Sequence, residues 1–474
     1  MHLLKDNFSP QPFITTALAL AVVLTLLLGF TPHRSPLPTR PAPSAEQDYE
    51  VFPTDSGFVV RGQLDQRVAL TTARADEAIN GAIDRLAGRP GEVLVHRGTY
   101  YLNAPIELPS HTTLRGKGDG TELWISPDNA EGIGIRSQRA DRSVVRDLAI
   151  KSAPEQTNGK IGVVLDHCGD CRVEGLLILG MREHGVWVGN NSFLCSVRHN
   201  SLADIDSSAI CITDIGPLGR GGSYVPITVS ENNVYDSGIG IECSKGINVQ
   251  ILGNVVYRAR QYAYYLHNNS NCCLLSANRT FQCYGDGIYV EKTHELNVNG
   301  NMISWQQGHG IVLKDVTWGT VSGNVINDPS SPTFAGGTPM QGYTPREDYT
   351  IFHEVPQGVN LRGKQRSGIR LTDRVRSVTV TGNALYCWGL ALPMDYGIYE
   401  DSQGVRNAIV SNTINYSTKA CILSEGQHTV VANNTELADS SYLANNRPWI
   451  ADSLQPVLQI FEPEVVEKFV KDQY

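Results

Sequence analysis

The chain has 474 residues, a formal net charge of −9 at pH 7 and only 18% charged residues. The acidic balance argues against nucleic acid as the partner, because phosphate backbones are bound by clustered Lys and Arg. The low charge and the 45 glycines are typical of many short strands and tight turns rather than of long helices.

The N-terminal part begins with a short tail at 1–12, which is followed by an uncharged apolar run at 13–30. The run is near the minimum length for a membrane-spanning helix, and no small-residue cleavage site follows it directly. We therefore expect an uncleaved signal anchor, the alternative being a cleaved signal peptide and a secreted protein. The Pro-rich residues 31–47 are then an extended linker. The charges on either side of the run do not fix its orientation.

Residues 48–142 are expected to form an N-terminal cap and the first coils of a repeat fold. Within them, residues 75–87 place apolar side chains on one helical face, with acids in the first turn. These apolar residues are Ala78, Ile79, Ala82, Ile83 and Leu86. The pattern predicts an amphipathic helix that closes one end of the fold.

From about residue 143 to 435 the sequence repeats itself. An Asn followed two residues later by an apolar residue recurs at intervals close to 23 residues, at Asn200, Asn232, Asn254, Asn278, Asn301, Asn324, Asn383 and Asn412. One coil of this length cannot bury its inner face, so coils must stack at about 4.8 Å. We expect each Asn to adopt a left-handed backbone and to form a side-chain ladder between coils.

Two segments interrupt or end the repeat. An insertion at 329–366 separates Asn324 from Asn383, and residues 436–474 are expected to form a C-terminal cap with a short helix that begins at Pro463. Elsewhere, a small residue and a short strand follow most of the Asn positions, as in Gly287-Ile-Tyr-Val.

Residues 91–124 contain Gly, an apolar strand, Gly-Thr-Tyr, and a strand that ends in Leu-Arg-Gly-x-Gly, and the 75–87 helix precedes them. This arrangement resembles the entry of the pectin-lyase-like superfamily, and the resemblance covers about residues 70–435. It implies an all-β, single-stranded right-handed parallel β-helix (a solenoid) with an N-terminal capping helix, here preceded by an N-terminal transmembrane anchor. It also implies an extracytoplasmic body, in the periplasm or at the cell surface.

The resemblance implies activity on long carbohydrates, by lyases, hydrolases or uronate epimerases, although some members have no catalysis. The Asp-Asp pair of polygalacturonases and the Asp-Pro-His motif of bacterial alginate epimerases are absent from the sequence. Catalytic residues of these families are therefore not carried over.

Stacking converts the sequence period into columns of outward side chains. The position before the small residue holds His184, Ser208, Tyr262, Asp286, His309 and Tyr396. The first outward position after the strand holds Thr213, Glu242, His267, Glu291, Lys314 and Thr372. The outward position between them holds Trp187, Tyr265, Tyr289 and Arg370.

These columns predict a site for sugar chemistry. We expect catalytic residues among Asp286, His309, Glu291, Lys314 and His267. We expect substrate-binding residues among Tyr262, Tyr265, Tyr289, Arg370 and Glu242. Cations hold a uronate carboxylate, and His transfers protons near neutral pH. The structural alternative is that these side chains bond turn backbone or form solvated ion pairs.

The first functional hypothesis is a polysaccharide lyase or C5-epimerase acting on a uronate-containing glycan. A glycoside hydrolase is the second, and it needs two carboxyls about 5–9.5 Å apart. Glu242 and Glu291, if two coils apart in one column, are separated by about 9.6 Å. The third hypothesis is a non-catalytic glycan-binding or surface assembly protein. No cofactor or metal is indicated by the sequence, although the sequence leaves Ca²⁺ open as an alternative. We expect Cys171, Cys195 and Cys273 to form one buried inward column, either as free thiols or with some of them bridged.

Overall fold

The computed structural model describes residues 48–152, 158–216, 226–327, 366–387, 394–415 and 417–437. The expected anchor at 13–30, the linker, nearly all of the insertion and the C-terminal helix lie outside these residues. No helix among the described residues is long and apolar enough to cross a membrane.

The N-terminal cap consists of three antiparallel strands and one helix. The strands are β1 (Tyr49–Thr54), β2 (Gly57–Gly62) and β3 (Val68–Thr72), and the helix is α2 (Ala75–Arg85). The predicted apolar face of α2 is fully buried, from Ala78 to Leu86. The capping helix is therefore confirmed. Strand β1 links the cap to the repeat, because β1 pairs in parallel with β4 (Gly91–Val95).

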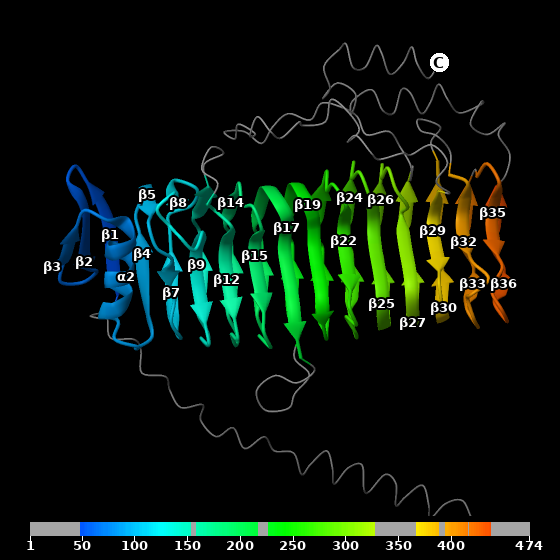
Figure 1. The fold of residues 1–474 in the computed structure, drawn as a ribbon, viewed down its shortest axis with the longest axis horizontal. Helices are drawn as coiled ribbons and strands as arrows, with labels where there is room; N and C mark the ends of the chain where they lie inside the picture. Colours follow the sequence, from blue (N-terminus) through cyan, green and yellow to red (C-terminus); the bar gives the residue numbers. More distant parts are fainter. Residues whose placement is uncertain are drawn as a thin grey trace, which may run out of the picture. The chain divides into compact units, whose positions relative to one another are not determined.

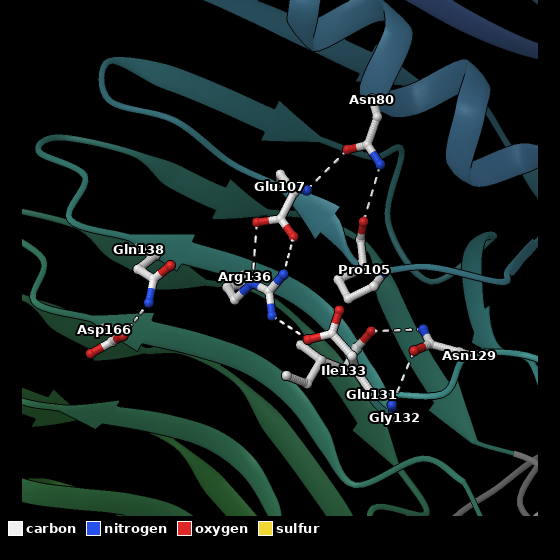
Figure 2. A network of polar contacts seen from close by, with 10 residues as sticks. All are labelled: Asn80, Pro105, Glu107, Asn129, Glu131, Gly132, Ile133, Arg136, Gln138 and Asp166. Atoms are coloured by element: carbon white, nitrogen blue, oxygen red, sulfur yellow. Dashed lines mark hydrogen bonds and ion pairs between the residues drawn. The ribbon is translucent and has the colours of Figure 1, made fainter.

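Polar contacts fasten α2 to the first coils (Figure 2). The side chain of Asn80 donates to the carbonyl of Pro105 (3.0 Å) and accepts the backbone N–H of Glu107 (2.9 Å). Glu107 in turn binds Arg136 on the following coil, and Arg136 also pairs with Glu131. The helix is thus fixed by hydrogen bonds to backbone groups as well as by its apolar face.

The remaining strands wind into coils with three parallel faces (Figure 1). Face 1 contains β4, β7 (Thr112–Arg115), β10 (Val144–Arg146), β13 (Arg172–Glu174), β16 (Ser196–Arg198), β18 (Ile227–Ser230), β20 (Val249–Leu252), β23 (Leu274–Ser276), β30 (Arg376–Thr381), β33 (Ala408–Val410) and β36 (Val430–Ala432). Face 2 contains β5 (Gly98–Leu102), β8 (Thr121–Ile125), β11 (Ala149–Ser152), β14 (Leu177–Leu179), β21 (Val255–Tyr257), β24 (Arg279–Phe281), β26 (Met302–Ser304), β28 (Val325–Asn327), β31 (Ala384–Tyr386), β34 (Thr413–Asn415) and β37 (Thr435–Leu437).

Face 3 carries the predicted site. It contains β6 (Ile106–Glu107), β9 (Ile133–Gln138), β12 (Ile161–Asp166), β15 (His184–Gly189), β22 (Tyr262–His267), β29 (Ser367–Thr372), β32 (Tyr396–Glu400) and β35 (Ala420–Ser424). Four long strands turn a corner between faces: β17 (Ser201–Ile215) and β19 (Asn233–Gly246) join faces 2 and 3, and β25 (Asp286–Asn299) and β27 (Ile311–Ser322) join faces 3 and 1. The predicted solenoid is therefore confirmed.

The interior of the coils is filled by stacked apolar columns. On face 1, one such column places fully buried side chains one above another, at Val173, Val197, Val229, Ile251 and Leu275. Alternate residues of each strand point inward, so every coil covers the apolar face of the coil before it. The predicted inward cysteines join this interior, because Cys171, Cys195 and Cys273 are buried as thiols.

A ladder of buried asparagines runs along the corner between faces 1 and 2. Each of eight side-chain amides donates to the side-chain oxygen of the next member and to a backbone carbonyl, at Asn200, Asn232, Asn254, Asn278, Asn301, Asn324, Asn383 and Asn412. The ladder ends at the partly buried Asn434, which accepts from Asn412 and donates to the carbonyl of Ile409. All eight predicted positions belong to it, and Asn434 is one more member.

The expectation that the ladder residues themselves adopt a left-handed backbone is wrong. The left-handed residue is the one before each Asn, for example Ala277 (φ 56°) and Gly300 (φ 61°). The corner is turned at that preceding position, which leaves the Asn free to place its amide inside. There its oxygen also accepts a backbone N–H of the previous coil, as Asn278 does from Asn254 (3.0 Å).

The ladder gives a prediction for stability. Asn278→Ala removes the acceptor of two Asn254 donors and the donor to the carbonyl of Ile251. Because these groups are buried, we expect a loss of about 3 kcal/mol of unfolding free energy. Denaturant midpoints followed by circular dichroism measure it. Asn297→Ala, an exposed Asn on β25, is the control, and equal midpoints for both variants would contradict the structural role of the ladder.

Candidate functional site

One predicted row of side chains is present on face 3. The strand register aligns Tyr262 with Asp286, and His309 follows on the next coil because its carbonyl accepts the N–H of Gly287 (3.0 Å). Ile239 occupies the same column on the coil before Tyr262. The row of Tyr262, Asp286 and His309 is therefore confirmed as a neighbouring set, and it ends at an apolar residue on its N-terminal side.

Glu242 lies in a different column from the one predicted. It aligns with Tyr265 on the next coil, not with His267. The expectation that Glu242 and Glu291 share a column is therefore wrong. The separation of about 9.6 Å that a shared column would give these two carboxylates does not apply. The predicted columns align on the glycine at the start of each strand, and this coil has two such glycines, Gly238 and Gly240. Because side chains alternate with period 2, the inward and outward pattern is the same for either glycine, and only the register differs.

A groove with a volume of about 610 Å³ lies across the middle of face 3. Predicted site residues that line it are Tyr262, Asp286, Tyr289, His309, Lys314 and Arg370. The tyrosines come from β22 and β25, and the two cations come from β27 and β29. The predicted residues Glu242, Tyr265, His267 and Glu291 lie on the same face but do not line the groove.

His309 is held in one orientation by its neighbours. Its backbone N–H donates to Asp286 Oδ1 (2.6 Å), and its ring Nδ1 accepts the backbone N–H of Ser367 (3.0 Å). A neutral imidazole that accepts at Nδ1 carries its proton on Nε2. The Arg370 guanidinium lies 3.4 Å from that Nε2, and it can only donate. His309 and Arg370 therefore present adjacent N–H donors at the groove.

At the other end of the groove, Tyr262 and Tyr289 pack against a third tyrosine, Tyr265, which does not line it. The ring of Tyr262 lies 4.6 Å from that of Tyr265 and 4.9 Å from that of Tyr289, measured between centroids. Burial raises the pKa of all three phenols, and for Tyr265 the hydrogen bond to Glu291 adds to it. At neutral pH these side chains are therefore proton donors and stacking surfaces rather than bases.

A chain of polar contacts follows the groove edge. The hydroxyl of Tyr265 donates to Glu291 (2.7 Å), and the Lys314 ammonium lies 3.6 Å from the same carboxylate. Lys314 also lies 3.9 Å from Asp373, and its side chain is 38% exposed. Lys314 is thus held at the groove by two carboxylates while solvent still reaches it.

A second polar cluster lies beside the tyrosines. Glu242 accepts hydrogen bonds from Ser208 and from His267 (2.9 Å), and the His267 ring stacks on that of Tyr265 at 4.1 Å. Burial pushes the pKa of Glu242 upward, but the bonds from His267 and Ser208 outweigh it and hold that pKa below its usual value. Glu242 and His267 therefore support Tyr265 from outside the groove.

Three charged groove residues, Arg260, Arg366 and Asp373, were not predicted from the sequence. Arg260 precedes β22 and donates to the carbonyls of Ile205 (3.0 Å) and Asp206 (2.6 Å). Arg366 stands just before β29, at the end of the insertion, where the repeat count is interrupted. Asp373 follows the last residue of β29 and adopts a left-handed backbone (φ 56°), which turns it out of the columns. Reading one residue past the end of the strand would have found Asp373, whereas no repeat signal identifies Arg366.

The groove therefore offers positive charge and hydrogen-bond donors to a ligand. Cations from three side chains, Lys314, Arg366 and Arg370, lie at one end, and Arg260 lies at the other end beside the phenols. In the part of the chain that the structure describes, no group of three or more His, Cys, Asp and Glu side chains is placed to hold a metal ion.

A family model described as periplasmic copper-binding protein (NosD) matches residues 222–339, which is a part of the repeat region. No curated protein sequence matches the chain.

Solved structures are similar in fold. The A-module of mannuronan C-5 epimerase AlgE6 from Azotobacter vinelandii has a TM-score of 0.62 at 15% identity, over 77% of this chain and 96% of that one. The A-module of AlgE4 from the same organism has a TM-score of 0.56 at 13% identity, over 78% and 94%. The Dettilon tailspike protein has a TM-score of 0.51 at 15% identity, over 74% and 64%. These likenesses confirm the parallel β-helix fold that the resemblance implied.

The Glu242 cluster gives a prediction for pH dependence. Because the pKa of Glu242 is lowered in the folded chain, its contribution to stability is present above the ordinary Glu pKa and is lost as the pH falls through the folded value. We expect Glu242→Gln to reduce the unfolding free energy by about 1–2 kcal/mol at pH 7 and by progressively less toward acid. Denaturant midpoints across this range measure it.

Glu231→Gln is the control, since Glu231 forms only an exposed pair with His199 and its side chain is 63% exposed. A stability difference between wild type and Glu242→Gln that is independent of pH would contradict the role given to the charged carboxylate.

Proposed function

We propose that this β-helix is a polysaccharide-processing enzyme that acts on a uronate-containing glycan in the face 3 groove, by lyase or C5-epimerase chemistry. The observation that carries the proposal is the adjacent donor pair of His309 and Arg370, which stands in one groove with Asp286 and with protonated tyrosines. The A-modules that share this fold are mannuronan C-5 epimerases, which supports the substrate class.

The groove binds the uronate through its charged end. A sugar carboxylate accepts hydrogen bonds from the donor pair of His309 and Arg370, and Lys314 adds positive charge from the next position along the groove. The rings of Tyr262 and Tyr289 offer apolar surface to a neighbouring sugar. Binding the carboxylate through cations also prepares the reaction, because it withdraws charge from the adjacent carbon.

Asp286 is the base of the proposed reaction. It takes the C5 proton, and the electron pair moves into an enolate that includes the substrate carboxylate. The N–H groups of His309 and Arg370 stabilise the two negative oxygens that develop. In a lyase the pair then forms the C4–C5 double bond and expels the C4 oxygen, which takes a proton from water. In an epimerase C5 takes a proton from the opposite face, and the Tyr289 phenol is the donor we assign. Proton exchange with water then returns Asp286 to its carboxylate and Tyr289 to its phenol.

Glycoside hydrolysis is the alternative function. It needs two carboxyl groups facing one glycosidic bond at about 5–9.5 Å. Asp286 lies at one end of its strand segment and Glu291 five residues along it, about 16 Å away by strand rise. Asp373, the other groove carboxylate named above, stands beyond the same end as Glu291. This separation favours proton abstraction over hydrolysis.

We place the body of the protein outside the cytoplasm, held to the membrane by residues 13–30. The apolar run, the Pro-rich linker and the partial match to a family described as periplasmic support this location. Alkaline extraction of membranes and protease digestion from the extracytoplasmic side test it. A body that alkali releases, or that protease cannot reach in intact cells, contradicts the anchored orientation.

The reaction is tested by incubating the full chain, purified in detergent, with a panel of polyuronates. We expect either absorbance from an unsaturated product, which identifies a lyase, or deuterium incorporation at C5 from heavy water, which identifies an epimerase. New reducing ends without unsaturation would establish the hydrolase instead. Binding without any of these reactions would establish the non-catalytic glycan-binding protein.

Variants of the donor pair test the mechanism. His309→Ala and Arg370→Ala each remove one donor that faces the developing negative charge, so we expect kcat to fall by about 10²–10³-fold in each. Tyr101→Ala, at an exposed tyrosine on face 2, is the control for an unrelated aromatic loss. A His309→Ala variant that keeps its kcat would remove His309 from the reaction.

Lys314 is expected to act in binding. Its ammonium is partly exposed and already paired with Glu291 and Asp373, so its attraction for a substrate carboxylate is screened. We expect Lys314→Ala to raise KM about tenfold, equivalent to about 1.4 kcal/mol, and to change kcat little. Steady-state kinetics over a range of polymer concentrations separate the two constants, and a variant with unchanged KM and kcat would exclude Lys314 from the site.

A further inference from the structure

We propose that the glycan-binding surface continues beyond the groove onto β32 and β35, where Tyr396, Tyr399 and Lys419 form an additional subsite for an acidic sugar residue. The inference rests on the proposed function and extends it, since it assigns a direction to the bound chain. The substrate then runs from the groove toward the C-terminal coils and not toward the N-terminal ones.

The strand register places this subsite next to the groove. Tyr399 aligns with Arg370, and Tyr396 aligns with Ser367, the residue whose N–H binds His309. Adjacent coils are about 4.8 Å apart, so Tyr399 is the next outward side chain along the axis after Arg370. Lys419 precedes Ala420, which aligns with Tyr396 on the following coil.

The contacts show two aromatic faces with a cation over each. The Arg370 guanidinium lies 5.4 Å from the ring centre of Tyr399, and the Lys419 ammonium lies 5.7 Å from that of Tyr396. The centres of the two rings are 5.3 Å apart and their planes are tilted by 45°, so the rings are not stacked face to face. A sugar ring laid on this surface meets an apolar face and, at its edge, a cation for its carboxylate.

Lys419 is held in place for this role. Its ammonium lies 3.5 Å from Asp395, and Asp395 also accepts the backbone N–H of Arg366 (3.0 Å). The Lys419 side chain is still 56% exposed, so a ligand carboxylate can reach it. Asp395 therefore orients Lys419 over Tyr396 and is itself partly neutralised by a backbone hydrogen bond.

The N-terminal side of the groove differs in its contacts. Its cation, Arg260, donates to the backbone carbonyls of Ile205 (3.0 Å) and Asp206 (2.6 Å). There the rings of Tyr265 and His267 stack on each other at 4.1 Å, and the Tyr265 hydroxyl is bound by Glu291. The next outward side chain in the Tyr265 column is Glu242, whose lowered pKa keeps it charged, and a uronate would be repelled there. The next aromatic residue in that column is Trp187, two coils farther on. The asymmetry gives the bound chain its direction.

The subsite is tested by the dependence of affinity on chain length. Oligouronates of increasing length are titrated into the full chain by calorimetry, with the variants Tyr399→Ala, Lys419→Gln and Trp187→Ala. We expect wild type to gain affinity once the oligomer is longer than the groove. We expect Tyr399→Ala to lose about tenfold on these longer oligomers and to bind the short ones unchanged, whereas Trp187→Ala, the matched aromatic in the same column, binds all of them like wild type.

Tyr399→Phe keeps the ring and is expected to bind like wild type, which separates loss of stacking from a folding defect. Lys419→Gln is expected to make the affinity for the longer oligomers less dependent on salt concentration. Wild-type affinity for long oligomers in Tyr399→Ala, or a loss confined to Trp187→Ala, would overturn the subsite while leaving the proposed function intact. Failure of wild type to bind any oligouronate would overturn the proposed function and the subsite together.

Discussion

The structure depends on the requirement that each coil be covered by another coil. A single coil leaves an apolar inner face and a full set of backbone N–H and C=O groups without partners. Stacking in parallel satisfies both at once, because the same register that pairs the backbones also places Val173 over Val197 and Asn278 over Asn301. The first and last coils have a neighbour on one side only. At the N-terminal end, α2 covers the first coil and is held there by the hydrogen bonds of Asn80.

The same stacking produces the candidate site. Outward side chains on face 3 repeat at the coil spacing, so residues far apart in sequence, such as Tyr262, Asp286 and His309, become neighbours without any loop to bring them together. The site is consequently built on rigid strands, and its donors are oriented by backbone groups. The N–H of Ser367, which fixes His309, belongs to the coil that follows the insertion, and the orientation of His309 in the groove therefore needs both coils to be in register.

Polar groups on the two sides of each coil have different tasks. Those inside, the asparagine amides, are fully bonded and buried, and they fix the path of the chain at one corner. Those outside divide into the groove set and a supporting set. Glu242 and His267 belong to the second, since they bond each other and stack against Tyr265 instead of facing the groove. The acid and base chemistry proposed for the site is thus limited to side chains that the strands direct into the groove.

The sequence by itself determined the fold and the coil spacing, because a coil has a nearly constant length and its burial pattern repeats in the residue count. That regularity identified the asparagine ladder, the capping helix and six side chains of the groove. It could not fix the column of Glu242, since alternation with period 2 is satisfied by either of two glycines, nor identify Arg366, since the insertion interrupts the count. Only the tertiary structure decided which nitrogen of His309 carries the proton and which aromatic faces remain open. Those properties depend on contacts between coils at the level of single atoms, and the residue spacing that defines a repeat contains no information about them.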